Sequence, residues 1–196
     1  KEYYSPLRLK SYELDNVLDS LERDGVAYVE LRLLDVNPFD PARISLEDMR
    51  FITAFIHYLL FCEESQSSAN PGERDEENRR KVANQGLDPE LMLMDGETER
   101  SMREWALSIL EDMREFCSLL DEYTDAFGGQ ASAALESALE RVNDPSKTYA
   151  SRLTKVLTEE GFVPGLIRLA HEYQEQAWCS RWLTAGFECW EMSTQL

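Results

Sequence analysis

Three alternating residues, Tyr28, Glu30 and Arg32, form the part of the sequence best suited to do chemistry. In a β-strand, residues two apart point to the same side at about 6.6 Å from each other, so a carboxylate and a guanidinium would face the same space. Magnesium prefers oxygen ligands, and a guanidinium matches two phosphate oxygens at once. The pattern alone leaves two interpretations open. One is a divalent-cation and phosphoryl site, and the other is a solvated strand face with a cross-strand ion pair contributing at most about 1 kcal/mol.

The residues around this triplet predict the strand that must position it. From Val26 to Leu34, apolar residues alternate with the triplet, which indicates one apolar and one charged face. The turn-forming run from Asn37 to Pro41 ends the strand. Residues 1–10 indicate extended structure rather than helix. We find one convincing strand pattern, and a lone strand cannot satisfy its own backbone donors and acceptors.

Helical periodicity predicts most of the remaining chain. Ser45 and Asp48 have the spacing of a capping box ahead of an apolar helix that we expect to be buried. Ser101 and Glu104 repeat this spacing ahead of a long amphipathic helix. The acidic and polar run 63–78 predicts a mobile loop. Further helices are expected before Gly25, before Gly86, at 131–142, at 148–160 and from Pro164 onward.

The composition of the chain excludes several classes of function. Its 196 residues include 20 Lys and Arg against 38 Asp and Glu, which gives a formal charge of −18. Such a chain repels phosphate backbones and anionic lipid, so we expect no nucleic acid or membrane partner. The most apolar stretch, 51–62, is shorter than the roughly 20 residues needed to cross a bilayer. Four cysteines without a CxxC pair favour reduced thiols and a cytoplasmic location.

A rival hypothesis requires no catalysis. The sequence lacks GxGxxG, GxxxxGK and HExxH motifs. The chain would then be a non-catalytic helical scaffold or regulatory domain that presents its acidic surface to a basic partner. The aromatic residues near its end fit either a docking surface or simple packing, and they are Trp178, Trp182, Phe187 and Trp190.

The residues of the strand and its exit add a more specific signal. The run YVELRLLDVNPFDP from Tyr28 to Pro41, followed by Arg50 and Phe51, resembles the proteobacterial type of glutamate-cysteine ligase. The preceding segment EYYSPLR and the paired glycines Gly128 and Gly129 are similar too. This likeness covers roughly residues 1–165 and weakens in the tail.

The resemblance implies an α/β, glutamine synthetase-like ligase fold, of which this chain would be the mostly helical C-terminal part with one or two sheet strands. It implies ATP-dependent ligation of the γ-carboxylate of L-glutamate to L-cysteine through an acyl phosphate. The product would be γ-glutamylcysteine, in the first step of glutathione biosynthesis. Mg²⁺ or Mn²⁺ would be the cofactor, with ATP as cosubstrate. A sister carboxylate–amine ligase with another amine substrate is a further alternative.

The resemblance also implies roles for individual residues. Glu30 matches a glutamate that binds the active-site metal. Arg32 matches an arginine that meets the transferred phosphoryl group, which gives it a catalytic and a cofactor-binding role, and Tyr4 matches a tyrosine of the cysteine pocket. Arg8 and Asn37 lie in matching motifs and are expected to be structural. The other metal-binding acids belong to the N-terminal half of the family's enzymes, so we expect this chain to need that half as a partner and to be inactive alone.

These inferences divide the chain into two parts. Residues 1–42 form a strand-containing segment that completes the active-site sheet. Residues 43–196 form a helical C-terminal region that includes the acidic loop at 63–78. Because the chain opens at Lys1 without an initiator Met and shows one strand pattern, we expect it to be a portion of a larger protein.

Overall fold

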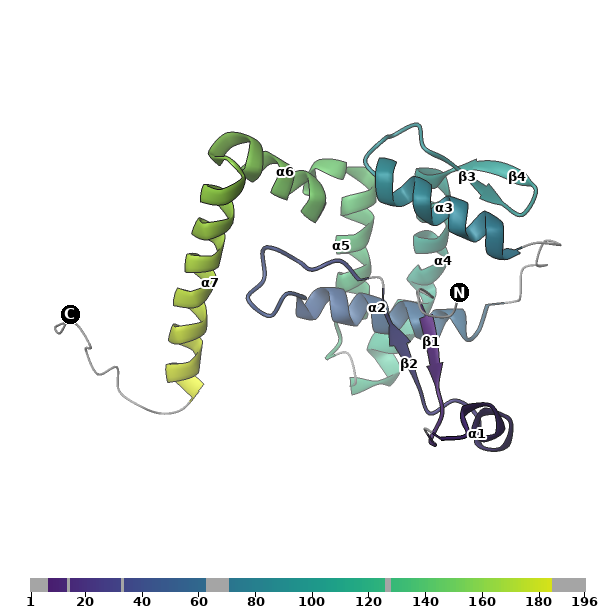
Figure 1. Ribbon diagram of the computed structural model, residues 1–196. Helices are drawn as coiled ribbons and strands as arrows, with labels where there is room; N and C mark the ends of the chain where they lie inside the picture. The colour runs from purple at the N-terminus through teal and green to yellow at the C-terminus, as the bar shows by residue number, and fades with distance from the viewer. Residues whose placement is uncertain (1–6, 14, 33, 63–70, 126–127, 185–196) are drawn as a thin grey trace. The chain divides into compact units, whose positions relative to one another are not determined.

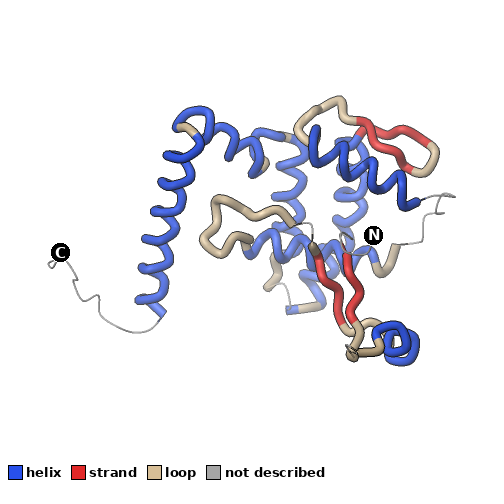
Figure 2. The backbone as a smooth tube through the Cα atoms, viewed as in Figure 1, coloured by secondary structure: helices blue, strands red, loops and turns tan. Residues whose placement is uncertain are grey.

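The computed structural model describes residues 7–13, 15–32, 34–62, 71–125 and 128–184 (Figure 1). The chain forms two compact units, Lys1–Val36 and Asn37–Leu196. The first unit contains a β-hairpin and one helix. The second unit is mainly helical and contains a separate β-hairpin (Figure 2).

In the first unit, two antiparallel strands flank a short helix in the sequence. Strand β1 (Leu7–Lys10) pairs with β2 (Tyr28–Leu31), and helix α1 (Val17–Asp24) lies between them in chain order. The helix ends at Gly25, as the sequence predicts. The N–H of Gly25 donates to the carbonyl of Leu21 at 3.1 Å, and its φ of +80° is a conformation that glycine adopts without strain.

Two expectations about the strand are corrected by this hairpin. The alternation predicts a strand over 26–34, whereas β2 is shorter and spans Tyr28–Leu31. The strand is also not alone, because β1 comes from the N-terminal segment that was expected only to be extended. A two-stranded ribbon is marginally stable by itself, so its stability depends on what covers its apolar face.

The second unit consists of helices and one short hairpin. The predicted helices at 131–142, 148–160 and around Pro164 are confirmed, and the last one begins two residues before Pro164. The elements in chain order are α2 (Leu46–Leu59), α3 (Pro71–Gln85), β3 (Met92–Asp95), β4 (Thr98–Ser101), α4 (Met102–Tyr123), α5 (Ala131–Asn143), the 3-10 helix η3 (Pro145–Lys147), α6 (Tyr149–Glu160) and α7 (Phe162–Thr184).

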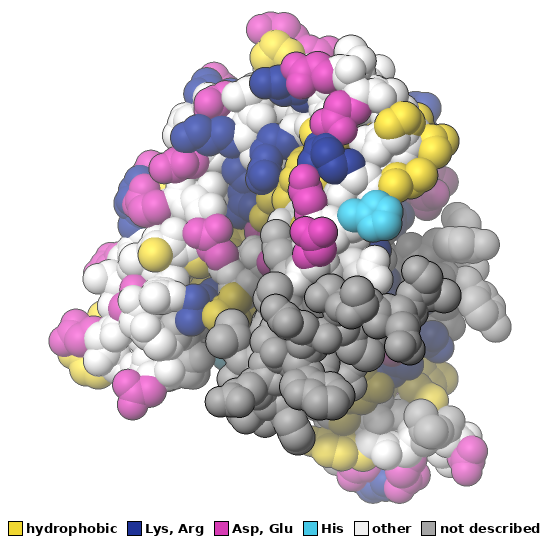
Figure 3. All heavy atoms as spheres, turned by 90° about the vertical axis from the view of Figure 1, so that its left-hand side faces the viewer, with side chains coloured by type: hydrophobic (Ala, Val, Ile, Leu, Met, Phe, Trp, Pro, Cys, Tyr) yellow, Lys and Arg dark blue, Asp and Glu magenta, His cyan; other side chains and the backbone are white. Residues whose placement is uncertain are grey.

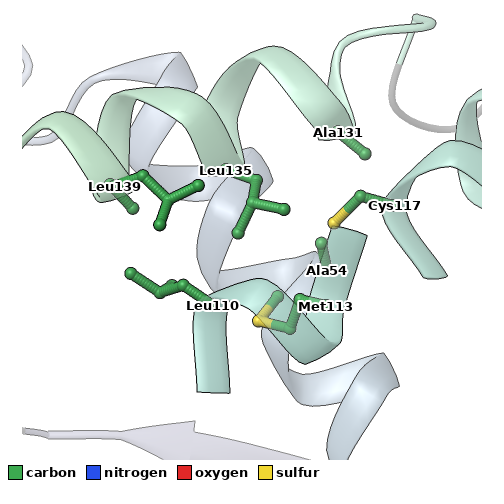
Figure 4. Close-up of a cluster of buried hydrophobic side chains, with 8 residues drawn as sticks. Ala54, Leu110, Met113, Cys117, Ala131, Leu135 and Leu139 are labelled. Carbon is green, nitrogen blue, oxygen red and sulfur yellow. The ribbon is translucent and has the colours of Figure 1, made fainter. Parts of the chain in front are cut away.

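The main hydrophobic core of the second unit lies between α2, α4 and α5. Figure 4 shows Leu135 and Leu139 of α5 directed toward Leu110 and Met113 of α4. Alanines from α2 and α5 complete the cluster, and their small size allows the helices to approach closely. The buried members are Ala54, Leu110, Met113, Cys117, Ala131, Leu135, Ala138 and Leu139.

Side-chain caps begin α2 and α4 where the sequence predicts them. Ser45 Oγ accepts a hydrogen bond from the Asp48 N–H at 3.0 Å, and Ser101 Oγ accepts one from the Glu104 N–H at 3.4 Å. Helix α5 begins differently. Asp121, at the end of α4, accepts hydrogen bonds from the first two N–H groups of α5 at 2.7 and 2.9 Å. Local sequence spacing does not reveal this long-range cap.

The second hairpin, β3–β4, is unexpected from the sequence, and it lies beside the polar helix α3. The acidic run 63–78 predicts a loop, but α3 begins at Pro71, so residues 71–78 are helical; residues 63–70 lie outside the described part. The Asn78 side chain accepts from the Met94 N–H at 2.9 Å and donates to the Met94 carbonyl at 2.8 Å. The helix thereby satisfies backbone groups on the edge of β3.

Helix α2 is less buried than its apolar composition predicts. Ala54 is its buried residue, whereas Leu46 is 60% exposed and Met49 is 49% exposed. The expectation of a buried helix is therefore wrong for one side of α2. Among the described residues, no helix combines the length and apolar character needed to span a membrane.

The acidic excess does not produce a uniformly negative surface. On the face shown in Figure 3, basic side chains are interspersed with acidic ones. Arg168, for example, lies 2.6 Å from Glu160 and 2.7 Å from Glu172. This mixture is shown for the face in Figure 3.

Candidate functional site

The register of the first hairpin gathers charged side chains on one face. Arg8 is directly opposite Glu30, and Lys10 is directly opposite Tyr28. Opposed residues of antiparallel strands share a face, so these four side chains lie on the same side of the ribbon. The predicted division into a charged and an apolar face is confirmed for the paired residues. The apolar face consists of Leu7, Leu9, Val29 and Leu31.

An ion pair connects the two strands across the charged face. Lys10 Nζ lies 3.1 Å from Glu30 Oε1, and the two side chains are 23% and 38% exposed. The contact is diagonal, because Lys10 is opposite Tyr28 rather than Glu30. Diagonal neighbours are within reach of long side chains. Glu30 is thus paired with a specific cation that the pattern of its own strand does not reveal.

The other two predicted site residues are less well defined by the structure. Arg32 follows β2 by one residue and is exposed. If strand alternation continues past Leu31, Arg32 lies on the Glu30 face, and its shared site with Glu30 stays a prediction. Tyr4 lies outside the described residues.

The donor atoms of the hairpin fit a partial metal site. No group of three His, Cys, Asp or Glu side chains that could hold a metal ion exists among the described residues. An ionised carboxylate has about four acceptor positions, so Glu30 can contact Lys10 and still offer oxygen to a cation. Magnesium usually takes one or two carboxylates, with water and substrate phosphates as its other ligands. Glu30 therefore fits as one ligand of a metal that has further ligands elsewhere.

The turn after the strand is held by its own polar contacts. Asn37 is 5% exposed, and its Oδ1 accepts a hydrogen bond from the Phe39 N–H at 2.9 Å. Its backbone N–H donates to the Arg43 carbonyl at 2.8 Å. Tyr173 of α7 donates to the Pro38 carbonyl. These bonds agree with the structural role expected of Asn37.

A second polar cluster, which sequence reasoning missed, ties α2 to α5 and α6. Arg141 Nη1 donates to Asp48 Oδ1 at 2.8 Å and to the Tyr149 hydroxyl at 2.9 Å, while that hydroxyl donates to Asp48 Oδ2 at 2.7 Å. Burial opposes ionisation of Asp48, but hydrogen bonds from Ser45, Tyr149 and Arg141 outweigh it and lower the pKa of this carboxyl. Because each charged group has a charged or hydroxyl partner, the cluster is a structural connection between helices.

A groove of about 450 Å³ borders the open side of α2. Its titratable members are Arg50 and His57, and the Nδ1 of His57 lies 2.7 Å from the Thr53 carbonyl of the same helix. The groove lies within the second unit and contains no carboxylate. Its lining residues are Leu46, Met49, Arg50, Thr53, His57, Leu120, Thr124 and Gly128.

The arrangement of two small sheets and a helical region is part of a known α/β ligase fold. The crystal structure of glutamate–cysteine ligase from Francisella tularensis in complex with AMP superposes with a TM-score of 0.76. At 24% identity the match covers 89% of this chain and 34% of that one. The expected fold class is therefore confirmed.

Sequence comparison specifies the relationship further. Residues 1–82 match the glutamate-cysteine ligase family model. The glutathione biosynthesis bifunctional protein of Clostridium perfringens is 31% identical over 196 residues, which is the whole of this chain and 25% of that protein. The glutamate–cysteine ligase of Pseudomonas paraeruginosa is 36% identical over 181 residues, or 89% of this chain and 33% of that protein.

The chain is thus a relative of glutamate–cysteine ligases and spans about a quarter to a third of the length of the relatives it matches. The expected resemblance is confirmed, including its partial coverage. It also extends further than expected, because the match to the Clostridium perfringens protein includes the tail beyond residue 165.

Proposed function

We propose that this chain forms part of the active site of a cytoplasmic, ATP-dependent glutamate–cysteine ligase. The reaction transfers the γ-phosphoryl group of ATP to the γ-carboxylate of glutamate and releases ADP. The amine of cysteine then attacks the acyl carbon, loses a proton, and displaces phosphate to give γ-glutamylcysteine. The remainder of the active site belongs to the portion of such a protein that precedes this chain.

The observation that carries this proposal is the charged face of the first hairpin. In a chain with a formal charge of −18, Arg8 and Lys10 share a strand face with a single carboxylate, Glu30. The net charge of this face is therefore positive although that of the chain is negative, and a locally positive surface is what binding of anionic ATP and glutamate requires. The same hairpin lies within the segment that matches the family model.

Each candidate residue has a distinct role in the proposal. When bound, a divalent cation, Mg²⁺ or Mn²⁺, would neutralise phosphate charge and orient the nucleotide. Glu30 offers it one carboxylate ligand. Arg32 donates to oxygens of the transferred phosphoryl group, where negative charge must be stabilised during transfer. Tyr4 contributes to the pocket for cysteine.

The direct test is Arg32→Ala in a full-length polypeptide that carries this chain. We expect kcat to fall by about 10³-fold or more, because a phosphoryl-binding arginine contributes on that order to rate. The measurement is ADP release that requires both glutamate and cysteine, with γ-glutamylcysteine identified by mass spectrometry. An Arg32→Ala variant with parental kcat would remove the phosphoryl role.

A matched control comes from the same unit. Arg23 is exposed and pairs with Asp24 at 2.6 Å and Glu13 at 2.8 Å, outside the paired strands. We expect Arg23→Ala to leave kcat within about twofold, since exposed ion pairs contribute little. A panel of amino acids in place of cysteine separates the sister-ligase alternative. If another amine drives ADP release faster than cysteine does, the chain belongs to a ligase with that acceptor.

A further inference from the structure

The proposed metal ligand already has a positively charged partner within this chain. Lys10 Nζ lies 3.1 Å from Glu30 Oε1, and the lysine side chain is only 23% exposed. The lysine comes from β1, so the ion pair spans the hairpin rather than lying along one strand. Among the described side chains, it is the ion pair that joins β1 to β2.

The choice of partner is informative, because Arg8 is closer to Glu30 in the register. Arg8 is directly opposite Glu30, yet the ion pair within 4 Å is made by Lys10 from the diagonal position. Lysine carries a compact charge on a flexible stem, whereas arginine favours bidentate pairing that would occupy both carboxylate oxygens. The contact with Lys10 is made through Glu30 Oε1.

A divalent cation on Glu30 would lie close to the Lys10 ammonium, and the two positive charges would repel each other. Binding must therefore displace the ammonium or tolerate it. Removing Lys10 has two opposite consequences for binding. It removes a competing charge, and it allows the Glu30 side chain more rotamers. We expect the loss of the competing charge to outweigh the gain in rotamer freedom. The ammonium lies only 3.1 Å from a carboxylate that is 38% exposed, whereas the ion pair restricts the rotamers of a single Glu30 side chain.

We propose that Lys10 is a positioning residue that competes with the divalent cation for Glu30. It keeps the carboxylate paired and directed along the charged face when no metal is bound, and it weakens metal binding. This inference rests on the proposed function, in which Glu30 is a metal ligand. Lys10 is not assigned any contact with substrate.

The experiment measures Mn²⁺ binding directly in a full-length polypeptide that carries this chain. Free Mn²⁺ is followed by electron paramagnetic resonance, without nucleotide or amino acids. We expect Lys10→Met to lower the Mn²⁺ dissociation constant about 3- to 10-fold. The Mg²⁺ concentration for half-maximal, glutamate- and cysteine-dependent ADP release should fall by a similar factor. Lys10→Arg, which restores a cation, should return both values toward the parental ones.

Arg8→Met is the matched control for net charge. It removes one cation from the same face without removing the ion pair to Glu30, so the Mn²⁺ dissociation constant should change by less than about twofold. If Arg8→Met and Lys10→Met shift binding equally, only general charge matters and the specific role of Lys10 is overturned. Circular dichroism melts of each variant verify that the fold is retained.

Glu30→Gln separates failure of this inference from failure of the proposed function. We expect it to weaken Mn²⁺ binding and to abolish the effect of adding Lys10→Met. If Glu30→Gln weakens binding but Lys10→Met does not tighten it, Lys10 has no such role and Glu30 remains a ligand. If Glu30→Gln changes neither Mn²⁺ binding nor the Mg²⁺ requirement, Glu30 is not a ligand, and both proposals about it are wrong.

Discussion

The two β-hairpins are both antiparallel pairs of four-residue strands, but they differ in how far other elements cover them. The β3–β4 hairpin is supported within its own unit, with Leu93 only 7% exposed and the edge of β3 bonded by Asn78 of α3. The β1–β2 hairpin has a Leu9 side chain that is 53% exposed and a Val29 side chain that is 40% exposed. The β3–β4 hairpin is thus supported by a helix of its own unit, whereas the apolar face of β1–β2 is only partly covered among the described residues.

The two hairpins therefore differ in how much support their own unit gives them. A two-stranded ribbon needs further strands or helices to be stable in water. For β3–β4 that support is a helix of its own unit. For β1–β2, the exposed apolar side chains and the charged opposite face fit the proposed position at the wall of a larger ligase site, and the relatives extend well beyond this chain.

The largest expected effect contrasts the helical core with the open hairpin face. Leu135 is 1% exposed, so Leu135→Ala should lower the free energy of unfolding of the chain by about 3 kcal/mol. Leu9→Ala should lower it by only about 1 kcal/mol or less, because about half of this side chain is already exposed. Urea unfolding followed by circular dichroism measures both. An equal loss for Leu9→Ala would show that its face is covered in solution and would break the comparison.

A smaller effect is expected for the Asp48–Arg141–Tyr149 cluster of the second unit. Asp48→Asn should cost about 2 kcal/mol at pH 7, because it leaves the half-buried Arg141 without its charged partner. Hydrogen bonds lower the pKa of Asp48 in the folded state despite its burial. Its stabilisation is therefore present above the unfolded value near pH 4 and is lost as pH falls through the folded pKa.

Urea unfolding of the parent chain and of Asp48→Asn at several pH values measures this pH dependence of stability. The difference between the parent and Asp48→Asn should shrink steadily below about pH 4. The exposed Asp112 on α4 provides the control. Asp112→Asn should change stability by less than about 0.5 kcal/mol at pH 7. A constant Asp48→Asn difference down to pH 2 would contradict the assignment to a charged carboxylate.

Local signals were sufficient to predict where α2 and α4 begin. Ser45 and Ser101 cap α2 and α4 as their spacing predicts, because a capping box is satisfied by neighbours three residues apart. The alternating faces around Glu30 were predictable for the same reason, since strand alternation is local. The family likeness was available in the residues from Tyr28 to Pro41.

Features that depend on distant residues were not predictable. The Lys10 partner of Glu30 requires the register of β1 against β2, and the Asp48–Arg141 bond joins residues 93 positions apart. The sequence predicted a helix that ends at Gly86, but the acidic composition of 63–78 indicated a loop where α3 begins at Pro71, and Asn78 of this helix bonds to Met94 of β3. The exposed side of α2 was not predicted, because an apolar composition indicates burial but does not show which element would cover the helix.

The smallest expected effect is for Asn78→Ala, which tests whether this side chain stabilises the edge of β3. Asn78→Ala removes a side chain that accepts from the Met94 N–H and donates to the Met94 carbonyl, so it should lower the free energy of unfolding by about 1 kcal/mol. The loss should be local, with amide hydrogen exchange at Met94 faster by about tenfold. Asn84 lies on the same helix and its side chain donates to the Arg80 carbonyl of α3, so Asn84→Ala should leave exchange at Met94 unchanged. If both variants accelerate exchange equally, helix stability rather than the Asn78 contact protects the edge, and the two hairpins then differ only in the burial of their apolar faces.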